Sequence, residues 1–243
     1  ITELTIDAAT SSTMSAAVGS VVGGEGKAGG AADIDAGAHI DGLIVEASSA
    51  TLDAVNILNG GVTAVSGGVT ADAAGYIADQ DINAATTAVL EADNDVTNTS
   101  VLAGTTVDVD AVSLHTSDLV AGGAVDIDLT EEMDGSTVNS LSTVTVDGNN
   151  VTNSAVDADG VIDINAATDI TNSIFKGDAA AAVAVDLLAG DGGIRNVEVT
   201  ALAGGAALDA ETEIDATDVQ ALLDVAARAG DAIAASSFVS ETG

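Results

Sequence analysis

The stretch Val107-Asp108-Val109-Asp110 shows the pattern that decides the fold: aliphatic residues alternate with others, and the phrase ends on a carboxylate. Residues that alternate in this way form a β-strand with aliphatic side chains on one face and acids on the other. Four later phrases are close variants of it: Val125-Asp126-Ile127-Asp128, Val144-Thr145-Val146-Asp147, Ile162-Asp163-Ile164-Asn165 and Val183-Ala184-Val185-Asp186.

The phrases recur at nearly constant intervals. Counted at the second apolar residue, the steps are 18, 19, 18 and 21 residues between Val109, Ile127, Val146, Ile164 and Val185. Similar strands at such a spacing are typical of a chain that winds and stacks coil on coil. The sequence therefore predicts an all-β fold, a parallel β-helix (β-solenoid) of roughly 18–21-residue coils, with these five residues in one inward column.

The same anchors occur earlier in the chain at one shared offset. Ile34, Leu52 and Ala71 each precede an anchor of the later phrases by 75 residues. A second phrase, Ile-Asp/Asn-Ala-Ala-Thr, begins at Ile6, Ile82 and Ile164. These matches predict a single solenoid domain over residues 1–243, with internal repeats at about 6–81, 82–163 and 164–217.

A recurring Thr-Asn-Ser/Thr step predicts stacked amides. Asn98, Asn153 and Asn172 each follow a Thr and precede a Thr or Ser. Amides at one position of successive coils can form hydrogen bonds along the stack.

The composition supports a narrow aliphatic interior and an acidic surface. Hydrophobic residues make up 47% of the chain but aromatic residues only 1%, and Trp, Pro and Cys are absent. The formal net charge is −35, which disfavours nucleic acid and anionic lipid as partners. No uninterrupted apolar run is long enough for membrane insertion.

Stacked coils would bring carboxylates together. At about 4.8 Å between coils, Asp110, Asp128, Asp147 and Asp186 are expected to form an outward column of like charges. Like charges on neighbouring strands are destabilising. The column therefore predicts either screening by salt or binding of divalent cations such as calcium.

A second candidate calcium site lies near the C-terminus. Residues 209–223 resemble the loop and exiting helix of an EF-hand or dockerin-type site, with Asp209, Glu211, Asp215 and Asp218 at ligand positions. Thr212 stands where the motif has its sharp-turn glycine. The alternative is that Thr217 simply caps a helix. In both cases the helical spacing of apolar residues predicts a short C-terminal capping helix at about 218–229.

The N-terminal segment predicts a strand with two alternative partners. Thr2 to Asp7 alternates, with Leu4, Ile6 and Ala8 on one face, and a glycine-rich stretch separates it from the strand phrase at Ile34. If that stretch is a flexible tether, the strand can pair with a neighbouring subunit. Otherwise it begins the first coil of its own chain.

The residue inventory does not favour catalysis. The chain has no Cys, two His, one Tyr and two Lys, so only carboxylate pairs remain for acid–base chemistry. We therefore expect no enzyme, although a β-helical polysaccharide hydrolase that uses two Asp residues is one alternative.

In its richness in Ala, Gly, Thr, Val and Asp, the chain resembles bacterial extracellular surface-layer and adhesin-type repeat proteins. The resemblance implies an extracellular or cell-surface location, self-association and calcium dependence. The expected function is a structural, self-assembling subunit of an extracellular filament or surface layer, whose partners are copies of itself. The other alternative is an adhesin or carbohydrate-binding module that binds extracellular polysaccharide.

Overall fold

The computed structural model describes residues 1–241, except for the side chains of Glu3, Leu4 and Ile6. The chain divides into two compact units, unit 1 (Ile1–Gly122) and unit 2 (Gly123–Gly243). Both are parallel β-solenoids, and together they contain about 12 coils of roughly 19 residues. The described residues contain strands and turns but no helix.

The strands of unit 1 are β1 (Thr2–Ala8), β2 (Ser12–Ala16), β3 (Val21–Ala28), β4 (Ala31–Asp41), β5 (Ile44–Ala47), β6 (Ser49–Leu58), β7 (Gly61–Ala64), β8 (Val69–Ala73), β9 (Ile77–Ala78), β10 (Asp81–Ala84), β11 (Ala88–Ala92), β12 (Val96–Thr97), β13 (Ser100–Ala103), β14 (Val107–Ala111), β15 (Leu114–His115) and β16 (Asp118–Ala121).

The strands of unit 2 are β17 (Val125–Leu129), β18 (Glu132–Asp134), β19 (Thr137–Ser140), β20 (Val144–Gly148), β21 (Asn150–Thr152), β22 (Ala155–Ala158), β23 (Ile162–Ala166), β24 (Ile170–Thr171), β25 (Ile174–Gly177), β26 (Val185–Ala189), β27 (Ile194–Arg195), β28 (Glu198–Ala201), β29 (Ala206–Ala210), β30 (Glu213–Asp215), β31 (Asp218–Ala221), β32 (Val225–Ala229), β33 (Ala232–Ala234) and β34 (Ser237–Ser240).

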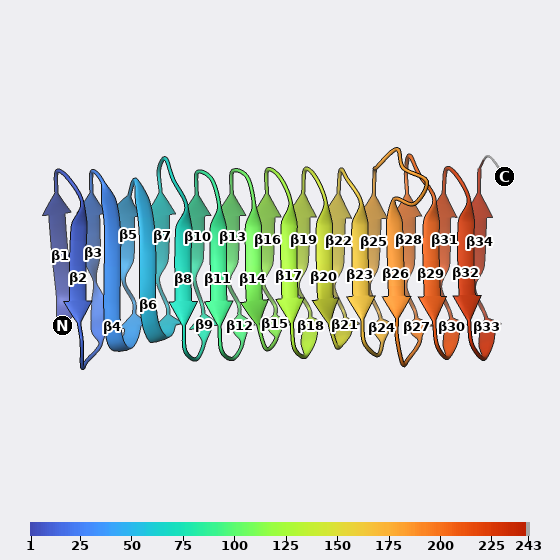
Figure 1. Ribbon diagram of the computed structural model, residues 1–243, viewed down its shortest axis with the longest axis horizontal. Coiled ribbons are helices and arrows are strands. Elements are labelled where there is room, and N and C mark those ends of the chain that lie inside the picture. Colours follow the sequence, from blue (N-terminus) through green and yellow to red (C-terminus); the bar gives the residue numbers. More distant parts are fainter. Residues whose placement is uncertain (242–243) are drawn as a thin grey trace. The chain divides into compact units, whose positions relative to one another are not determined.

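Each regular coil has three strands, and strands at the same place in successive coils pair in parallel (Figure 1). We call the three sides faces A, B and C in chain order. In unit 1 face A is formed by β2, β4, β6, β8, β11 and β14, and face C by β1, β3, β5, β7, β10, β13 and β16. In unit 2 face A runs from β17 to β32 and face C from β19 to β34 in steps of three strands.

The predicted inward column is confirmed in unit 1. Ile34, Leu52 and Ala71 lie opposite one another in β4, β6 and β8, and the column continues through Leu90 to Val109. All five side chains are buried, with exposed fractions of 3% or less. The offset of 75 residues between Ile34 and Val109 therefore spans four coils.

In unit 2 the column is confirmed except at Val185. Ile127, Val146 and Ile164 lie opposite one another, but Ile164 faces Leu187, while Val185 faces Ile162. The cause is a longer connection between β25 and β26, which Figure 1 shows as an additional loop beside β28. It shifts the last phrase by two residues, a change that alternation alone cannot detect, because inward residues stay inward.

One corner of each coil is built around a left-handed residue. Asn59, Asp79, Asn98, Asn153, Asn172 and Asn196 occupy this corner with φ between 47° and 54°. Asn and Asp tolerate this region better than most residues. The predicted amide stacking is confirmed in part: Asn196 Nδ2 donates a hydrogen bond to the Asn172 amide oxygen at 2.9 Å, whereas Asn153 Nδ2 donates to a carboxylate, Asp134 Oδ1, at 2.7 Å.

The residue after this corner points inward and forms a buried ladder of hydroxyl groups. The Ser173 hydroxyl is an example: it donates to Thr171 O at 2.9 Å and accepts the backbone N–H of Ser154 at 3.1 Å. Its side chain is 1% exposed. Other members are Thr99, Ser117, Ser136, Ser154 and Thr217. The ladder satisfies backbone groups at a place where the chain turns and regular strand pairing is interrupted.

The predicted helix at 218–229 is wrong: this segment forms β31, a turn and all of β32. Val219 and Ala221 are buried opposite Val199 and Ala201 of the preceding coil. Thr217 is the hydroxyl-ladder residue before β31 and not a helix cap. A helix of about twelve residues is marginal by itself, whereas stacking on a preformed coil pairs the backbone and extends the core.

The predicted flexible tether is also wrong. Gly23 and Gly24 lie in β3, Gly29 and Gly30 lie between β3 and β4, and β1 pairs in parallel with β3 of the same chain, with Asp7 opposite Lys27. The strand therefore begins the first coil of its own chain, which is the second of the two alternatives. The predicted face of Leu4, Ile6 and Ala8 depends on two side chains that lie outside the described residues.

Candidate functional site

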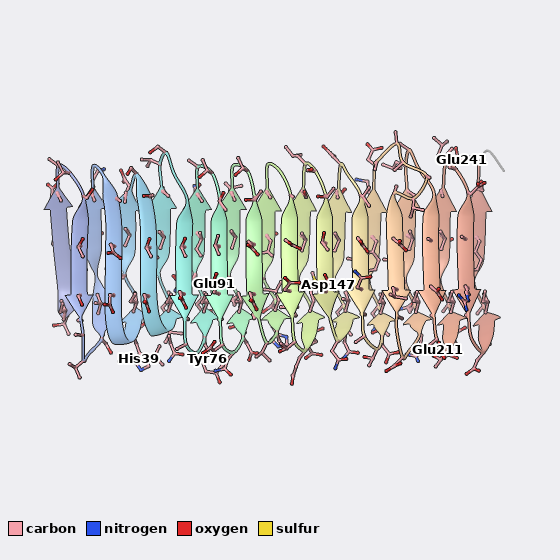
Figure 2. All side chains as sticks on the ribbon, in the orientation of Figure 1. His39, Tyr76, Glu91, Asp147, Glu211 and Glu241 are labelled. Atoms are coloured by element: carbon pink, nitrogen blue, oxygen red, sulfur yellow. The ribbon has the colours of Figure 1, made fainter. Side chains whose placement is uncertain are left out.

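The most prominent feature of unit 1 is an acidic column on the outside of face A. Asp35, Asp53 and Asp72 lie directly opposite one another, and Glu91 and Asp110 continue the column. It arises because each of these residues follows an inward anchor by one position, which turns its side chain outward. Figure 2 labels Glu91 on this face.

The neighbouring acids of this column affect the pKa of Asp53. The pKa of Asp53 is raised, first by partial burial and then by the negative charges of Asp72, Asp35 and Asp33. Neighbouring strands lie about 4.8 Å apart, so the column concentrates like charge along one line. Such a surface attracts cations and repels anions.

In unit 2 the acidic column is shorter than predicted. Asp128 and Asp147 lie opposite each other, as expected, but the next positions are Asn165 and Leu188. Asp186 lies opposite Asp163 in the other outward column of face A, so its predicted place beside Asp147 is wrong. Its pKa is raised, first by burial and then by Asp163 and Asp209.

The second predicted calcium site does not form the expected loop and exiting helix. Asp209 is in β29, Glu211 lies in the following turn, Asp215 is in β30 and Asp218 is in β31. Asp209 forms an ion pair with Arg228 at 3.7 Å, and Asp215 lies opposite Arg195 in the strand register. Within residues 1–241, apart from the undescribed side chains, no three His, Cys, Asp or Glu residues are grouped closely enough to hold a metal ion. Calcium binding stays a prediction.

Arg195 forms the most connected ion-pair cluster among the described side chains. Its Nε atom donates to Glu213 at 2.7 Å, and Nη1 donates to Asp169 at 2.9 Å. Asp169 also accepts the backbone N–H of Gly193 at 2.8 Å. The cluster joins three successive coils at the place where residues 178–184 enlarge one of them, which indicates a structural role.

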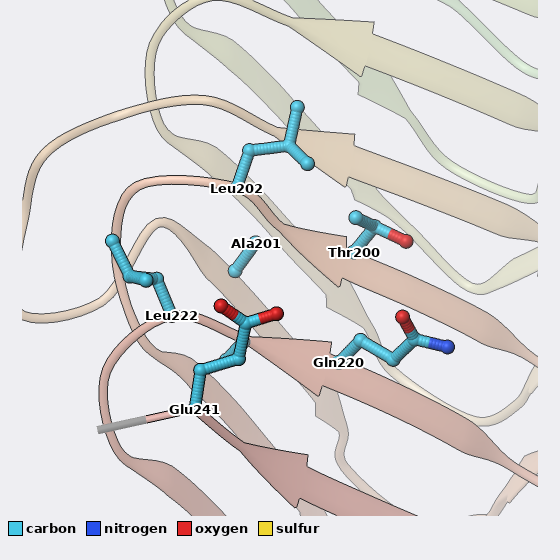
Figure 3. A pocket seen from close by; sticks show the side chains of 7 residues that line it. Thr200, Ala201, Leu202, Gln220, Leu222 and Glu241 are labelled. Atoms are coloured by element: carbon cyan, nitrogen blue, oxygen red, sulfur yellow. The ribbon is translucent and has the colours of Figure 1, made fainter.

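Two hollows lie on the surface of unit 2. The larger one, about 340 Å³, follows the asparagine corner and is lined by Asn172, Ser173, Ile174, Asn196, Val197, Glu198, Ala216 and Asp218. The smaller one, about 80 Å³, lies beside Leu202, Gln220 and Glu241 (Figure 3). Neither lining contains an aromatic residue on which a sugar ring could stack.

Inward residues of the last described coil are more exposed than their counterparts one coil earlier. Ile233 in β33 is 49% exposed, although Ile214, directly opposite it in the preceding coil, is fully buried. The inward residues Val225, Ala227 and Ala229 of β32 are likewise half-buried. In the described part of the chain β32 pairs with β29 on one side and with no strand on the other.

The first described coil pairs with the coil that follows it. Strand β2 pairs only with β4 among the described residues, and β1 only with β3. Met14, the central inward residue of β2, is 8% exposed, and Ser12 and Ala16 on either side of it are half-buried.

No described helix is long and apolar enough to cross a membrane. No protein-family model, curated protein or solved structure matches this chain.

Proposed function

We propose that the protein is a structural subunit that assembles with copies of itself into an extracellular filament or surface layer. The observation that carries the proposal is the parallel stacking of similar coils, as in β4, β6 and β8, together with exposed apolar side chains such as Ile233, which is 49% exposed. Burying exposed apolar surface favours association, and parallel strands can also pair between molecules.

The acidic surface is consistent with an extracellular material of bacterial type. The net charge of −35 keeps the sides of the molecules apart and allows contact only where the charge is low or screened. Calcium or other cations outside the cell would reduce the repulsion along the acidic columns.

Electron microscopy and sedimentation of the purified protein test the proposal. We expect filaments or sheets at physiological ionic strength, and sedimentation far above that of the 23.4 kDa chain. Replacing Ile233 by Asp should abolish assembly and leave the fold intact, because the side chain is half exposed. As a matched comparison, Ile214→Asp should unfold the C-terminal coils. A protein that stays monomeric at all salt and calcium concentrations would overturn the proposed function.

A further inference from the structure

We propose that copies of the protein pack side by side through face C of unit 1. The contact centres on four outward residues that occupy one position of successive strands (Figure 1), and we call them the neutral strip: Thr63 in β7, Asn83 in β10, Leu102 in β13 and Val120 in β16. This inference rests on the proposed self-assembly and adds the surface through which neighbouring copies meet.

The neutral strip carries no charge, in contrast to the matching surface of face A. There, the outward column of β6, β8, β11 and β14 is acidic at every position: Asp53, Asp72, Glu91 and Asp110. A chain with a net charge of −35 repels its own copies wherever acids of both molecules meet. Of the two faces, face C therefore allows the closer approach.

The acid next to the neutral strip is balanced within its own chain. Glu46 in β5 lies opposite Thr63, and its carboxylate forms an ion pair with Lys27 Nζ at 2.7 Å. The other lysine of the chain acts in the same way on face C of unit 2, where Lys176 pairs with Asp157 at 2.7 Å. Both lysines thus reduce the charge of face C, and neither reduces the charge of face A.

Face C of unit 1 also exposes large apolar side chains. Leu102 is 50% exposed, and Ile44 in the neighbouring strand β5 is 55% exposed. Within the strip, Asn83 is exposed, and Thr63 and Val120 are half-buried. Burying these side chains between two copies favours association. A centre that is apolar and poor in charge is typical of protein interfaces.

A two-fold axis parallel to the coil stack of unit 1 matches the neutral strip to itself. It places Leu102 of one copy against Leu102 of the other, and Asn83 against Asn83. The acids Asp81 and Asp118 lie two residues away from the strip along β10 and β16. The axis carries them to opposite sides of the strip, about 13 Å from their counterparts along the strand direction. Salt screens most of the repulsion at that distance.

The contact is small, so it acts within an assembly and not as an isolated pair. Four strands about 4.8 Å apart, with four residues of about 3.3 Å each, give roughly 250 Å² on each copy. A stable pair of proteins buries about 800 Å² on each partner. One such contact is weak, but repeated contacts between two neighbouring filaments add to one another. The neutral strip therefore joins filaments side by side.

Cross-linking of single-cysteine variants tests the contact, because the chain contains no cysteine of its own. Asn83→Cys places a thiol on the neutral strip. Since packed sheets lie about 10 Å apart, a short bis-maleimide should link two copies of the assembled variant into a dimer. Thr51→Cys is the matched control, because Thr51 is an exposed, uncharged, outward residue of β6 on face A. It should react equally with a mono-maleimide but give no dimer.

A pair of charge variants tests the same contact by electron microscopy. Leu102→Asp adds a carboxylate between Asn83 and Val120 and should abolish side-by-side association. Thr70→Asp adds a carboxylate between Thr51 and Val89 on face A and should leave the association unchanged. Both substituted side chains point outward, so circular dichroism should show that both variants keep the fold.

The outcomes separate this inference from the proposed function. Assemblies that form normally but give no dimer from Asn83→Cys, or give it equally with Thr51→Cys, overturn the contact and leave self-assembly standing. Unchanged side-by-side association of Leu102→Asp has the same meaning, and it would indicate an occupant of face C other than a second copy. A parent chain that never assembles overturns both. A dimer from Asn83→Cys alone, with loss of association in Leu102→Asp alone, supports the inference.

Discussion

Asp53 and Asp72 lie directly opposite each other on the neighbouring parallel strands β6 and β8, and both point away from the core. One position earlier, Leu52 and Ala71 are opposed in the same way and are 1% exposed. The same strand pairing thus gives a favourable apolar contact inside and an unfavourable like-charge contact outside. The acidic column lowers the stability of the fold, and the aliphatic core offsets this loss. Salt or bound cations can reduce the repulsion between the acids.

Replacing Asp53 by Asn should therefore stabilise the protein. The substitution removes one charge that is flanked by Asp35 and Asp72, and like charges on neighbouring strands cost about 1 kcal/mol or less. The measurement is urea unfolding at low salt. Asp81→Asn is the matched control, because Asp81 lies between Gly61 and Ser100 and has no acidic neighbour in register. An equal gain from both variants would contradict a specific effect of the column.

The pH dependence of stability should follow from the two carboxyl groups whose pKa is raised by burial and by neighbouring acids. The pKa values of Asp53 and Asp186 are raised in the folded state, so the folded protein binds more protons than the unfolded chain as these groups titrate. Their contribution to stability is present below the pKa of an unfolded Asp, and it is lost as pH rises through the folded pKa. Melting temperatures across mildly acidic pH should rise on acidification in the parent chain and rise less in Asp53→Asn. Identical slopes for the two proteins would contradict this assignment.

Introducing a charge into the inward column should destabilise the protein. Ile127 in β17 is fully buried and lies opposite Val146 in β20. Ile127→Asp should destabilise unit 2 by more than about 3 kcal/mol, because it buries a carboxylate without a partner. Asp147→Asn, on the outward side of the neighbouring coil, should be neutral or stabilising. Circular dichroism and urea unfolding check both, and tolerance of Asp at position 127 would show that the strand register is wrong.

Alternation predicted the strands and the core better than it predicted their alignment. It identified the inward column from Ile34 to Val109, because every second residue there is aliphatic and the coil length is nearly constant. It failed at Val185, because residues 178–184 lengthen one coil by an amount that preserves the alternation. The helix at 218–229 was predicted from apolar spacing, but pairing with β28 and β29 prevails over that local preference.

The candidate site was only partly visible in the sequence. Outward acids follow from the strand pattern, whereas the opposition of Asp186 and Asp163 depends on the shifted register. The hydroxyl ladder was missed, since single Ser and Thr residues carry no strong signal; the left-handed Asn before them was the available clue. The difference in exposure between Ile214 and Ile233 is apparent only from the structure, because both are inward positions of the same pattern.

The hydroxyl ladder should contribute measurably to stability. Ser173→Ala removes the acceptor of the Ser154 backbone N–H and the donor to Thr171 O, at a cost of about 1–3 kcal/mol. The adjacent ladder position is Val197, which is 2% exposed and has no hydroxyl group. Val197→Ser adds a hydroxyl group at this ladder position. It should therefore lower the free energy of unfolding by less than Ser173→Ala does, although it removes aliphatic contacts. Unfolding in urea compares them, and the reverse order would contradict a stabilising ladder.

Calcium should stabilise the protein more than sodium at the same ionic strength. Divalent cations can bridge carboxylates on neighbouring strands, whereas a monovalent salt only screens them. Asp35, Asp53 and Asp72 provide such neighbours in unit 1. Melting temperatures are to be compared in chelator, in calcium chloride and in sodium chloride of matched ionic strength. The double variant Asp53→Asn/Asp72→Asn interrupts the column and should lose the additional effect of calcium, while Asp81→Asn should retain it. Equal shifts in calcium and sodium would show that the acidic columns are screened and not bridged, and the predicted calcium sites would then have to be abandoned.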